Sequence, residues 1–354
     1  MSLSIGIVGL PNVGKSSLFN ILTKNQAEAA NYPFCTIDPN VGIVQVPDFR
    51  LEKLANISKP DKIIPTAIEF VDIAGLVSGA HKGEGLGNKF LAHIRECDAI
   101  CEVIRDFKDD NIIHVDGKID PESDKETINM ELILADLTTV EKRLDKVRRE
   151  AKSGDKEMIV FQEILEKIYK HLEEEKAVRS MDFTEEEMVL VKTLGLLTIK
   201  PIIYLLNVDE SHKDDVLSGT NNQIVRINVK LEEEIAKLPE EEQEEYIKEL
   251  GLEEKGLDKL IESAYNLLGL ETFFTTGPME TKAWTIRKGD KAPIAAGEIH
   301  TDFIKNFIRA EIINWEKFVE AGGETEAKEK GLVKTEGKDY IVKDGDVCHF
   351  LINK

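Results

Sequence analysis

A run of residues near the start of the chain has the composition of a phosphate-binding loop. Gly9-Leu-Pro-Asn-Val-Gly-Lys-Ser-Ser17 contains the pattern G-x-x-x-x-G-K-[ST] and follows the hydrophobic segment Ser4 to Val8. Glycines let backbone N–H groups turn toward a phosphate, and a lysine adds a cation near the β- and γ-phosphates. A chance glycine turn is the alternative, but the whole pattern between a strand and a helix argues against it. We predict a nucleotide site formed by Asn12, Val13, Gly14, Lys15, Ser16 and Ser17.

Three further residues are predicted to complete the triphosphate and magnesium site. The Ser16 hydroxyl is one expected Mg²⁺ ligand, and Asp72 stands at the end of a hydrophobic segment, where a carboxylate can hold the ion. Gly75 follows in Asp-Ile-Ala-Gly, and its N–H is expected to reach a γ-phosphate. Thr36 lies in a loop that could close on magnesium when a triphosphate is bound. The metal ligands expected are therefore Ser16, Thr36 and Asp72.

The base specificity should be altered relative to guanine-reading proteins. Such proteins use Asn-Lys-x-Asp, in which the aspartate accepts two hydrogen bonds from guanine. Here the corresponding run is Asn207-Val208-Asp209-Glu210, in which valine replaces the lysine and glutamate replaces the aspartate. We predict base contacts from Asn207, Val208 and Glu210, and binding of ATP at least as well as GTP. The alternative is that Glu210 or Asp209 still accepts from guanine.

Hydrolysis is expected to be slow, since Leu76 occupies the position at which Ras-like enzymes orient water with a glutamine. His81 and His114 are the candidates for that role, beside the ordinary interpretation of each as a solvated loop histidine. Lys15 is the predicted catalytic cation. Asn12 is a candidate ligand for a monovalent cation that would add positive charge near the phosphates, or an ordinary loop asparagine.

The elements that must hold these residues indicate an α/β fold. Strand-like segments alternate with helices that begin near Lys15 and Asn88, as in a mostly parallel sheet covered on both faces. The expected strands are Ser4 to Val8, Thr66 to Val71, Ala99 to Ile104, Ile202 to Leu206 and Ile224 to Ile227.

Two apolar series interrupt this alternation at coiled-coil spacing. The first runs from Met130 to Val147 and the second from Met158 to Leu172, with a turn at Ser153-Gly-Asp155 between them. Thr184 and Glu187 form a capping box for a further helix to about Leu197. Beyond Gly277 we expect a small α+β unit with a helix around Thr301 to Ile313. The domains predicted are 1–125 with 200–276, an inserted antiparallel coiled coil over 126–199, and a C-terminal unit over 277–354.

Composition excludes several classes of protein. The chain has 354 residues, of which 42% are hydrophobic, and this content is typical of a globular protein. Its formal net charge of −21 argues against a protein that holds nucleic acid through its overall electrostatic field. No apolar run is long enough to span a bilayer, so we expect no membrane partner and a cytoplasmic location. The four scattered cysteines are predicted to be reduced thiols.

The chain resembles the Obg-related YchF group, also called Obg-like ATPases. The resemblance is carried by the phosphate loop, by Asn31-Tyr-Pro-Phe-Cys-Thr-Ile-Asp-Pro-Asn, by Asp72-Ile-Ala-Gly-Leu-Val, by Gly83 to Leu91, by Asn111-Ile-Ile-His-Val and by Gly297 to Phe303. It implies a P-loop G domain with Ser16 and Thr36 on magnesium, a coiled-coil insert and a C-terminal TGS domain of β-grasp type. It also implies preference for ATP, a role for His114 in hydrolysis, stimulation by K⁺, and the ribosome, as the large subunit or a 70S-type particle, as partner. The run Ile227-Asn-Val-Lys230 departs from the alanine-rich loop common in the group.

The tip of the predicted hairpin is locally basic within an acidic chain. Its cations are Lys142, Arg143, Lys146, Arg148, Arg149, Lys152 and Lys156. We predict a monomer that contacts ribosomal RNA through this tip and the TGS domain, although a solvated helix face is the ordinary alternative. The function predicted is an ATP-hydrolysing switch on the ribosome that regulates translation. The alternatives are a guanine-specific ribosome-assembly GTPase and an ATP-gated binding module whose hydrolysis is incidental.

Overall fold

The structure is a computed structural model, and it describes residues 3–24, 40–73, 87–109, 118–209, 217, 224–252 and 254–353. The chain divides into two compact units. Unit 1 comprises Met1–Asn25, Thr36–Gly42 and Glu69–Leu260, and unit 2 comprises Gln26–Cys35, Ile43–Ile68 and Ile261–Lys354.

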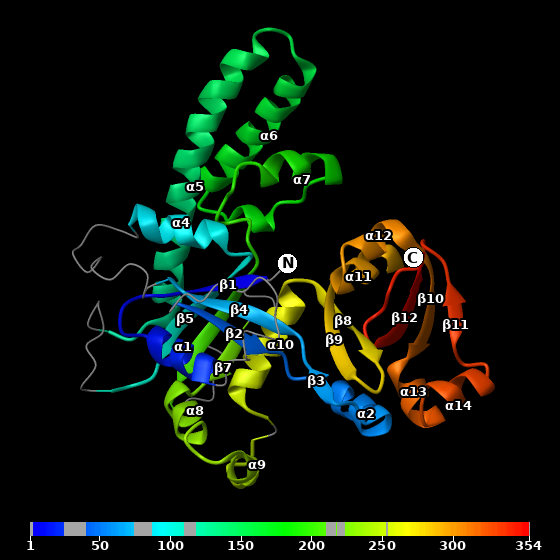
Figure 1. The fold of residues 1–354 in the computed structure, drawn as a ribbon. Coiled ribbons are helices and arrows are strands. Elements are labelled where there is room, and N and C mark those ends of the chain that lie inside the picture. Colours follow the sequence, from blue (N-terminus) through cyan, green and yellow to red (C-terminus); the bar gives the residue numbers. More distant parts are fainter. Residues whose placement is uncertain are drawn as a thin grey trace. The chain divides into compact units, whose positions relative to one another are not determined.

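The first sheet has six strands in the order β2-β4-β1-β5-β6-β7 (Figure 1). The pairings of β1 with β4 and β5, of β5 with β6, and of β6 with β7 are parallel. Every residue of β5 is buried, as expected for a central strand covered on both faces. The predicted α/β fold with a mostly parallel sheet is confirmed. The strands are β1 (Ser4–Val8), β2 (Val41–Gln45), β4 (Ala67–Asp72), β5 (Ala99–Asp106), β6 (Ile202–Val208) and β7 (Ile224–Ile227).

Helices of unit 1 cover this sheet through an apolar core. Phe90 and Ile94 of α4, and Ile128 and Leu132 of α5, pack with residues of the central strands. Residues 229–249 form two separate helices, because the chain breaks at Leu238 and Pro239. The helices of this part are α1 (Lys15–Lys24), α4 (Asn88–Glu96), α5 (Pro121–Ala151), α6 (Lys156–Glu173), α7 (Glu185–Lys192), α8 (Val229–Ile235) and α9 (Glu240–Glu249), and α10 (Gly256–Leu267) crosses the division between the units.

Helices α5 and α6 form an antiparallel pair that projects from the sheet of unit 1 (Figure 1). Val140, Leu144 and Val147 of α5 are buried against Phe161, Leu165 and Ile168 of α6, so the apolar seam expected from the spacing is covered. Asp155 caps α6 by accepting from the N–H groups of Glu157 and Met158. The capping box of Thr184 and Glu187 is present, but α7 ends at Lys192 rather than near Leu197, since Gly195 follows with φ +59°.

Unit 2 contains a second six-stranded sheet in the order β11-β10-β12-β8-β9-β3. It is mixed: β10 is antiparallel to β11 and β12, and β8 to β9, whereas β12–β8 and β3–β9 are parallel. Its strands are β3 (Lys62–Ile64), β8 (Leu270–Thr276), β9 (Glu280–Arg287), β10 (Phe307–Asn314), β11 (Lys334–Glu336) and β12 (Asp346–Ile352). Its helices are α2 (Phe49–Ser58), α11 (Ala292–Ile299), α12 (Asp302–Asn306), α13 (Trp315–Ala321) and α14 (Glu324–Glu329).

The helix expected around Thr301 to Ile313 is wrong over most of its length. Only Asp302–Asn306 is helical, and Phe307–Asn314 is the strand β10. The apolar residues of this segment fit a helical or an extended period. The segment forms a strand because it pairs with β12 on one side and with β11 on the other, and this pairing satisfies its backbone hydrogen-bonding groups.

The division into units differs from the boundary expected at Gly277, and it places residues 43–68 with the C-terminal part. Strand β3 pairs with β9, and Leu51 and Leu54 of α2 are buried in one cluster with Phe274, Phe318 and Val347. Apolar burial of α2 and backbone pairing of β3, both with residues far along the chain, therefore place these two elements in unit 2.

Among the described helices, none combines the length and the apolar character that crossing a bilayer requires. Cys97, Cys101 and Cys348 are free buried thiols, and Cys35 lies outside the described residues.

Candidate functional site

The predicted phosphate loop connects β1 to α1 and uses backbone conformations that favour glycine. Gly9 and Gly14 have φ of +146° and +103°, and Asn12 has φ of +63°. A Cβ atom at Gly9 would lie 2.3 Å from the Val103 carbonyl oxygen, and one at Gly14 would lie 2.5 Å from Asn207 Nδ2. Both the backbone angle and the close neighbours thus require glycine at these two positions.

Lys15 is the cation of this loop and is buried at the first residue of α1. Its Nζ donates to the Leu10 carbonyl at 2.5 Å. Burial lowers the pKa of Lys15 from 10.5 to about 8, while the nearby Asp72 carboxylate acts in the opposite direction. Because the Lys15 ammonium is buried and donates to a neutral carbonyl, an anionic ligand at this position would be strongly attracted to it.

Ser16 and Asp72 lie together, as predicted for a magnesium site. The Ser16 hydroxyl donates to Asp72 Oδ2 at 3.5 Å, and Asp72 is 5% exposed at the end of β4. A hydroxyl and a carboxylate are the oxygen ligands that Mg²⁺ prefers, so these two residues fit the ion. Thr36, the third predicted ligand, lies outside the described residues.

Asn207 joins the phosphate loop to the strand β6 and to the start of α8. Its Nδ2 donates to the Val13 carbonyl at 3.0 Å, and its Oδ1 accepts from the Val229 N–H at 3.2 Å. Asn207 is itself 6% exposed. Its amide therefore holds the phosphate loop against β6 and α8, and the base contact expected of Asn207 stays a prediction.

These residues surround a cavity of about 880 Å³ at the carboxyl ends of the parallel strands, where ligands of open α/β sheets bind. Sequence reasoning missed part of its lining, namely Phe107, Lys108, Asp109 and Glu233. Their only signal in the sequence was their position after strand β5 and within α8. The lining residues are Asn12, Gly14, Lys15, Ser16, Ser17, Phe107, Lys108, Asp109, Asn207, Val208, Asp209, Asn228, Val229, Lys230 and Glu233.

The segment after β5 is held in place by two contacts. The buried Arg105 donates through Nε to the Phe107 carbonyl at 3.1 Å, and its guanidinium lies 4.5 Å from the centre of the Phe107 ring. The Lys108 N–H donates to Asp209 Oδ2 at 3.0 Å. One oxygen of the Asp209 carboxylate is thus engaged by the protein's own backbone.

Several predicted residues fall outside the described part of the chain. These are Thr36, Gly75, Leu76, His81, His114 and Glu210. Asn12, Val13, Gly14, Lys15, Ser16, Ser17, Asp72, Asn207 and Val208 are described, and the structure brings the first six together with Asp72 and Asn207.

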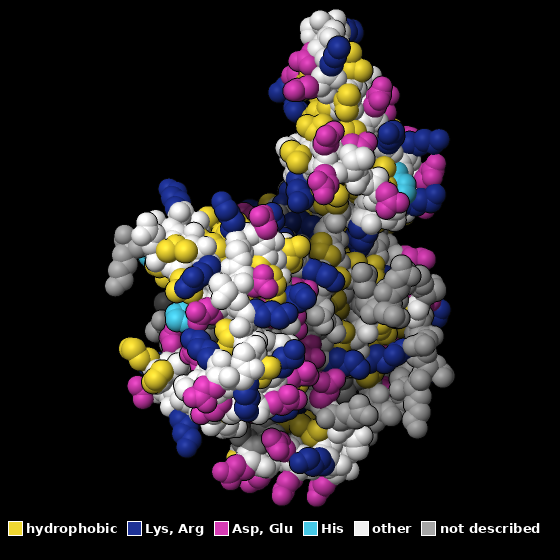
Figure 2. All heavy atoms as spheres, turned by 90° about the vertical axis from the view of Figure 1, so that its right-hand side faces the viewer, with side chains coloured by type: hydrophobic (Ala, Val, Ile, Leu, Met, Phe, Trp, Pro, Cys, Tyr) yellow, Lys and Arg dark blue, Asp and Glu magenta, His cyan; other side chains and the backbone are white. Residues whose placement is uncertain are grey.

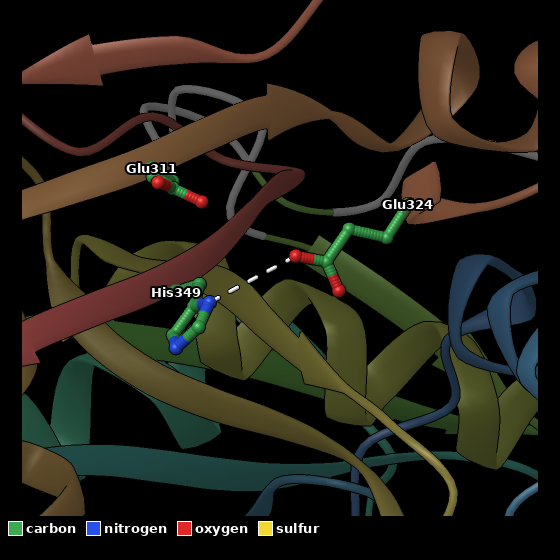
Figure 3. A group of neighbouring side chains, drawn as sticks. All are labelled: Glu311, Glu324 and His349. Atoms are coloured by element: carbon green, nitrogen blue, oxygen red, sulfur yellow. Dashed lines mark ion pairs between the residues drawn. The ribbon is translucent and has the colours of Figure 1, made fainter. Parts of the chain in front are cut away.

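A different group of possible metal ligands occurs in unit 2. One ligand atom each from Glu311, Glu324 and His349 lie within 4.8 Å of one another (Figure 3). Lys328 is already bound there, with its Nζ 2.9 Å from Glu311 Oε2 and 2.8 Å from Glu324 Oε1. The pair of carboxylates is therefore neutralised in part by an ammonium of the chain itself.

Comparison with known proteins places these features among relatives of similar length. A family described as "50S ribosome-binding GTPase" matches residues 4–142, and one described as "Protein of unknown function (DUF933)", the C-terminal part of YchF GTPases, matches residues 270–353.

Two similar curated proteins are both named "Ribosome-binding ATPase YchF". The Bacillus subtilis protein is 55% identical over 365 residues, and that of Escherichia coli O157:H7 is 51% identical over 362 residues, each match covering 100% of both chains. Among solved structures, the YchF GTPase of Schizosaccharomyces pombe has a TM-score of 0.91 and 39% identity, covering 99% of this chain and 98% of its own.

Proposed function

The chain belongs to the YchF family of P-loop proteins, and from this premise we propose that it is a nucleotide-dependent switch that binds and slowly hydrolyses ATP and associates with the ribosome. The observation that carries the nucleotide part is the arrangement of Gly14, buried Lys15 and Ser16 beside Asp72, at the end of a cavity large enough for a nucleoside triphosphate. The ribosome is proposed as partner because the relatives are named for binding it.

In this proposal, the phosphate loop and Lys15 bind the triphosphate, and Ser16 and Asp72 would hold Mg²⁺, with Thr36 as a third ligand. The ion would supply neutralising charge at the β- and γ-phosphates. Gly75 is proposed to donate its N–H to the γ-phosphate, and His114 to orient the attacking water, with K⁺ as an additional cation near Asn12. The last three assignments rest on the sequence motifs and the family resemblance.

Preference for ATP over GTP is supported by two features of the base end of the cavity. Val208 stands where guanine-reading proteins carry lysine, and Asp209 has one carboxylate oxygen engaged by the Lys108 N–H. Asp209 therefore offers a guanine fewer open acceptor positions than the aspartate of guanine-reading proteins. Glu210 is the remaining acceptor, and its longer side chain is proposed to be poorly placed for guanine.

Side-by-side binding and turnover of ATP and GTP test this proposal. We expect ATP to bind more tightly, turnover to be slow, and K⁺ and ribosomes to raise it. A strong preference for GTP would instead support a guanine-specific ribosome-assembly GTPase. Full biological activity with a nonhydrolysable ATP analogue would support a binding module in which hydrolysis is incidental.

The helical pair α5–α6 is proposed to act as a coiled-coil arm that contacts ribosomal RNA, and the C-terminal part to be a TGS domain. Acidic side chains lie among the cations of this arm on the face seen in Figure 2. Arg148 pairs with Glu166 at 3.1 Å, and both are about half exposed, so this pair holds Arg148 only weakly. Arg148 is thus available to phosphates.

Charge reversal tests the arm separately from the nucleotide site. Arg148→Glu with Arg149→Glu should weaken ribosome association and flatten its salt dependence, while ATP affinity is unchanged. The matched control is Lys192→Glu on α7, outside the tip. Unchanged association of the double variant would remove the arm from the interface.

A further inference from the structure

Unit 2 contains a second cavity, which the proposed function does not use. Its volume is about 350 Å³, a size that suits a small ligand or one side chain of a partner. Its lining comes from the C-terminal end of β8, from the end of α11 and the start of α12, and from β10, α13, α14 and β12.

The wall of this cavity is largely apolar. Ile313 of β10 and Val347 of β12 are directly paired across the two strands, and Phe318 of α13 packs in the same cluster. These side chains are 6%, 6% and 3% exposed. Ile299 and Phe303 also line the cavity, and both belong to the run from Gly297 to Phe303, which carries the family resemblance but has no part in the nucleotide site. Part of that run therefore lines this cavity.

We call the more exposed, polar part of the lining the opening of the cavity. Glu311 and His349 are directly paired on β10 and β12, and they point to the same side as Ile313 and Val347, two residues along each strand. Glu324 begins α14, and its Oε1 lies 3.8 Å from His349 Nδ1 (Figure 3). The side chains of Glu311, Glu324 and His349 are 23%, 47% and 65% exposed, in contrast to the buried apolar wall.

The carboxylates at this opening already hold an ammonium. Lys328 Nζ lies at hydrogen-bonding distance from both Glu311 and Glu324, and its side chain is 46% exposed. Two carboxylates and one ammonium give Glu311, Glu324 and Lys328 a summed charge of −1. The Glu311 and Glu324 oxygens lie 2.9 Å and 2.8 Å from Lys328 Nζ. These are hydrogen-bonding distances, longer than the roughly 2.0–2.2 Å of metal–carboxylate bonds.

We propose that this cavity binds an organic cation with an apolar body. The carboxylates of Glu311 and Glu324 hold the ammonium head, and Ile313, Phe318 and Val347 cover the hydrocarbon part. Lys328 acts as an internal competitor that occupies the carboxylates when no ligand is bound. The same chemistry is offered by a free alkylamine and by a lysine beside an apolar residue in a partner polypeptide.

Titration of the full-length protein with two cations distinguishes these sources. The probes are n-hexylammonium and the blocked dipeptide acetyl-Phe-Lys-amide, and n-hexanol and hexanoate serve as the neutral and anionic controls. Methyl NMR signals of Ile313 and Val347 report binding at the cavity, and calorimetry gives the affinity. Binding of either cation supports the proposal and identifies its source, whereas binding of hexanol as tightly as hexylammonium would exclude recognition of the charge.

Three single substitutions test the assigned roles. Glu311→Gln should weaken binding of the cation by roughly tenfold, since it removes one charge-assisted hydrogen bond. Lys328→Met should strengthen it by a similar factor, a result that a purely structural ion pair would not give. Glu329→Gln, on the same helix but outside the cavity, should change nothing.

Thermal unfolding of each variant confirms that it is folded, and Glu324→Gln replaces Glu311→Gln if the latter is not. The proposal is overturned if neither cation shifts the methyl signals, or if only Zn²⁺ binds at the Glu311–Glu324–His349 cluster. It is also overturned if Lys328→Met leaves the affinity for the bound cation unchanged.

Discussion

The nucleotide cavity of unit 1 and the apolar cavity of unit 2 draw their residues from the chain in different ways. The first is formed by turns at the carboxyl ends of parallel strands, and its main element is the continuous loop from Gly9 to Ser17. The second is formed by side chains on the face of antiparallel strands and on helix ends, from Thr275 to Phe350.

The two cavities differ in whether the residues that form them also stabilise the fold. In unit 1 the backbone conformation forms the phosphate site, and Lys15 lies there at a cost in solvation that the nearby Asp72 offsets only in part. In unit 2 the residues that form the cavity wall, such as Phe318, are also core residues. Truncation of Lys15 should therefore affect mainly binding, and truncation of Phe318 mainly stability.

The largest expected effect is on stability, from Phe318→Ala. Phe318 is 3% exposed, and its removal leaves a void beside Ile313 and Val347. We expect a loss of about 3–5 kcal/mol in the free energy of unfolding, measured with urea, while the ATP affinity of the folded protein is unchanged. A loss below about 1 kcal/mol would contradict the view that the wall is part of the core.

Lys15→Ala should weaken ATP binding without lowering stability, the reverse of Phe318→Ala. Without the ammonium, ATP affinity is expected to fall by about 100-fold, measured with a fluorescent ATP analogue. Unfolding free energy should remain the same or rise, because a buried cation with few charged partners is removed. A loss of unfolding free energy as large as that of Phe318→Ala would contradict this contrast between the two units.

Asn207→Ala tests whether the side-chain amide holds the phosphate loop. The change leaves the Val13 carbonyl and the Val229 N–H without their buried partner, and we expect a loss of about 2 kcal/mol in stability together with weaker ATP binding. Asn306→Ala, at an exposed position of α12, is the matched control and should change stability by less than about 0.5 kcal/mol.

The smallest expected effect is a pH dependence of nucleotide binding. Burial lowers the pKa of Lys15 to about 8, so the free protein loses this proton as pH rises above that value, whereas phosphate binds the charged form. ATP affinity should decline above pH 8, by at most about tenfold per pH unit. The stability contribution has the other sign, since between about pH 8 and 10.5 the unfolded chain binds more protons and unfolding free energy rises with pH.

Lys15→Arg provides the control for this pH dependence. Arginine keeps its charge throughout the range, so the decline in affinity above pH 8 should disappear. An identical decline in the variant and in the native protein would assign it to another group.

The residues of the nucleotide cavity could be predicted where the chemistry depends on a short run or on the end of a strand. Gly14, Lys15, Ser16 and Asp72 are of this kind, and the structure brings them together. Phe107 and Lys108 were missed because no residue type marks them, and they line the cavity only because β5 lies beside β6. Asn207 was found, but its contact with Val13 depends on tertiary structure.

Unit 2 was harder to predict, since its elements are defined by pairing between distant segments. Whether Phe307–Asn314 is a helix or a strand is decided by β11 and β12, and the pairing of Glu311 with His349 follows only from that register. No local pattern places α2 and β3 with this unit. The size of the C-terminal part could therefore not be read from the composition change near Gly277.

The inclusion of α2 and β3 in unit 2 has a consequence for biosynthesis. Ser58 and Thr276, whose hydroxyl groups are 2.6 Å apart, are separated by 218 residues, so the early segment leaves the translating machinery long before its strand partner exists. Until then Leu51 and Leu54 have no cluster to enter, and they are exposed to chaperones and to nascent chains nearby. A fragment that starts at Gly277 would lack them permanently and should aggregate.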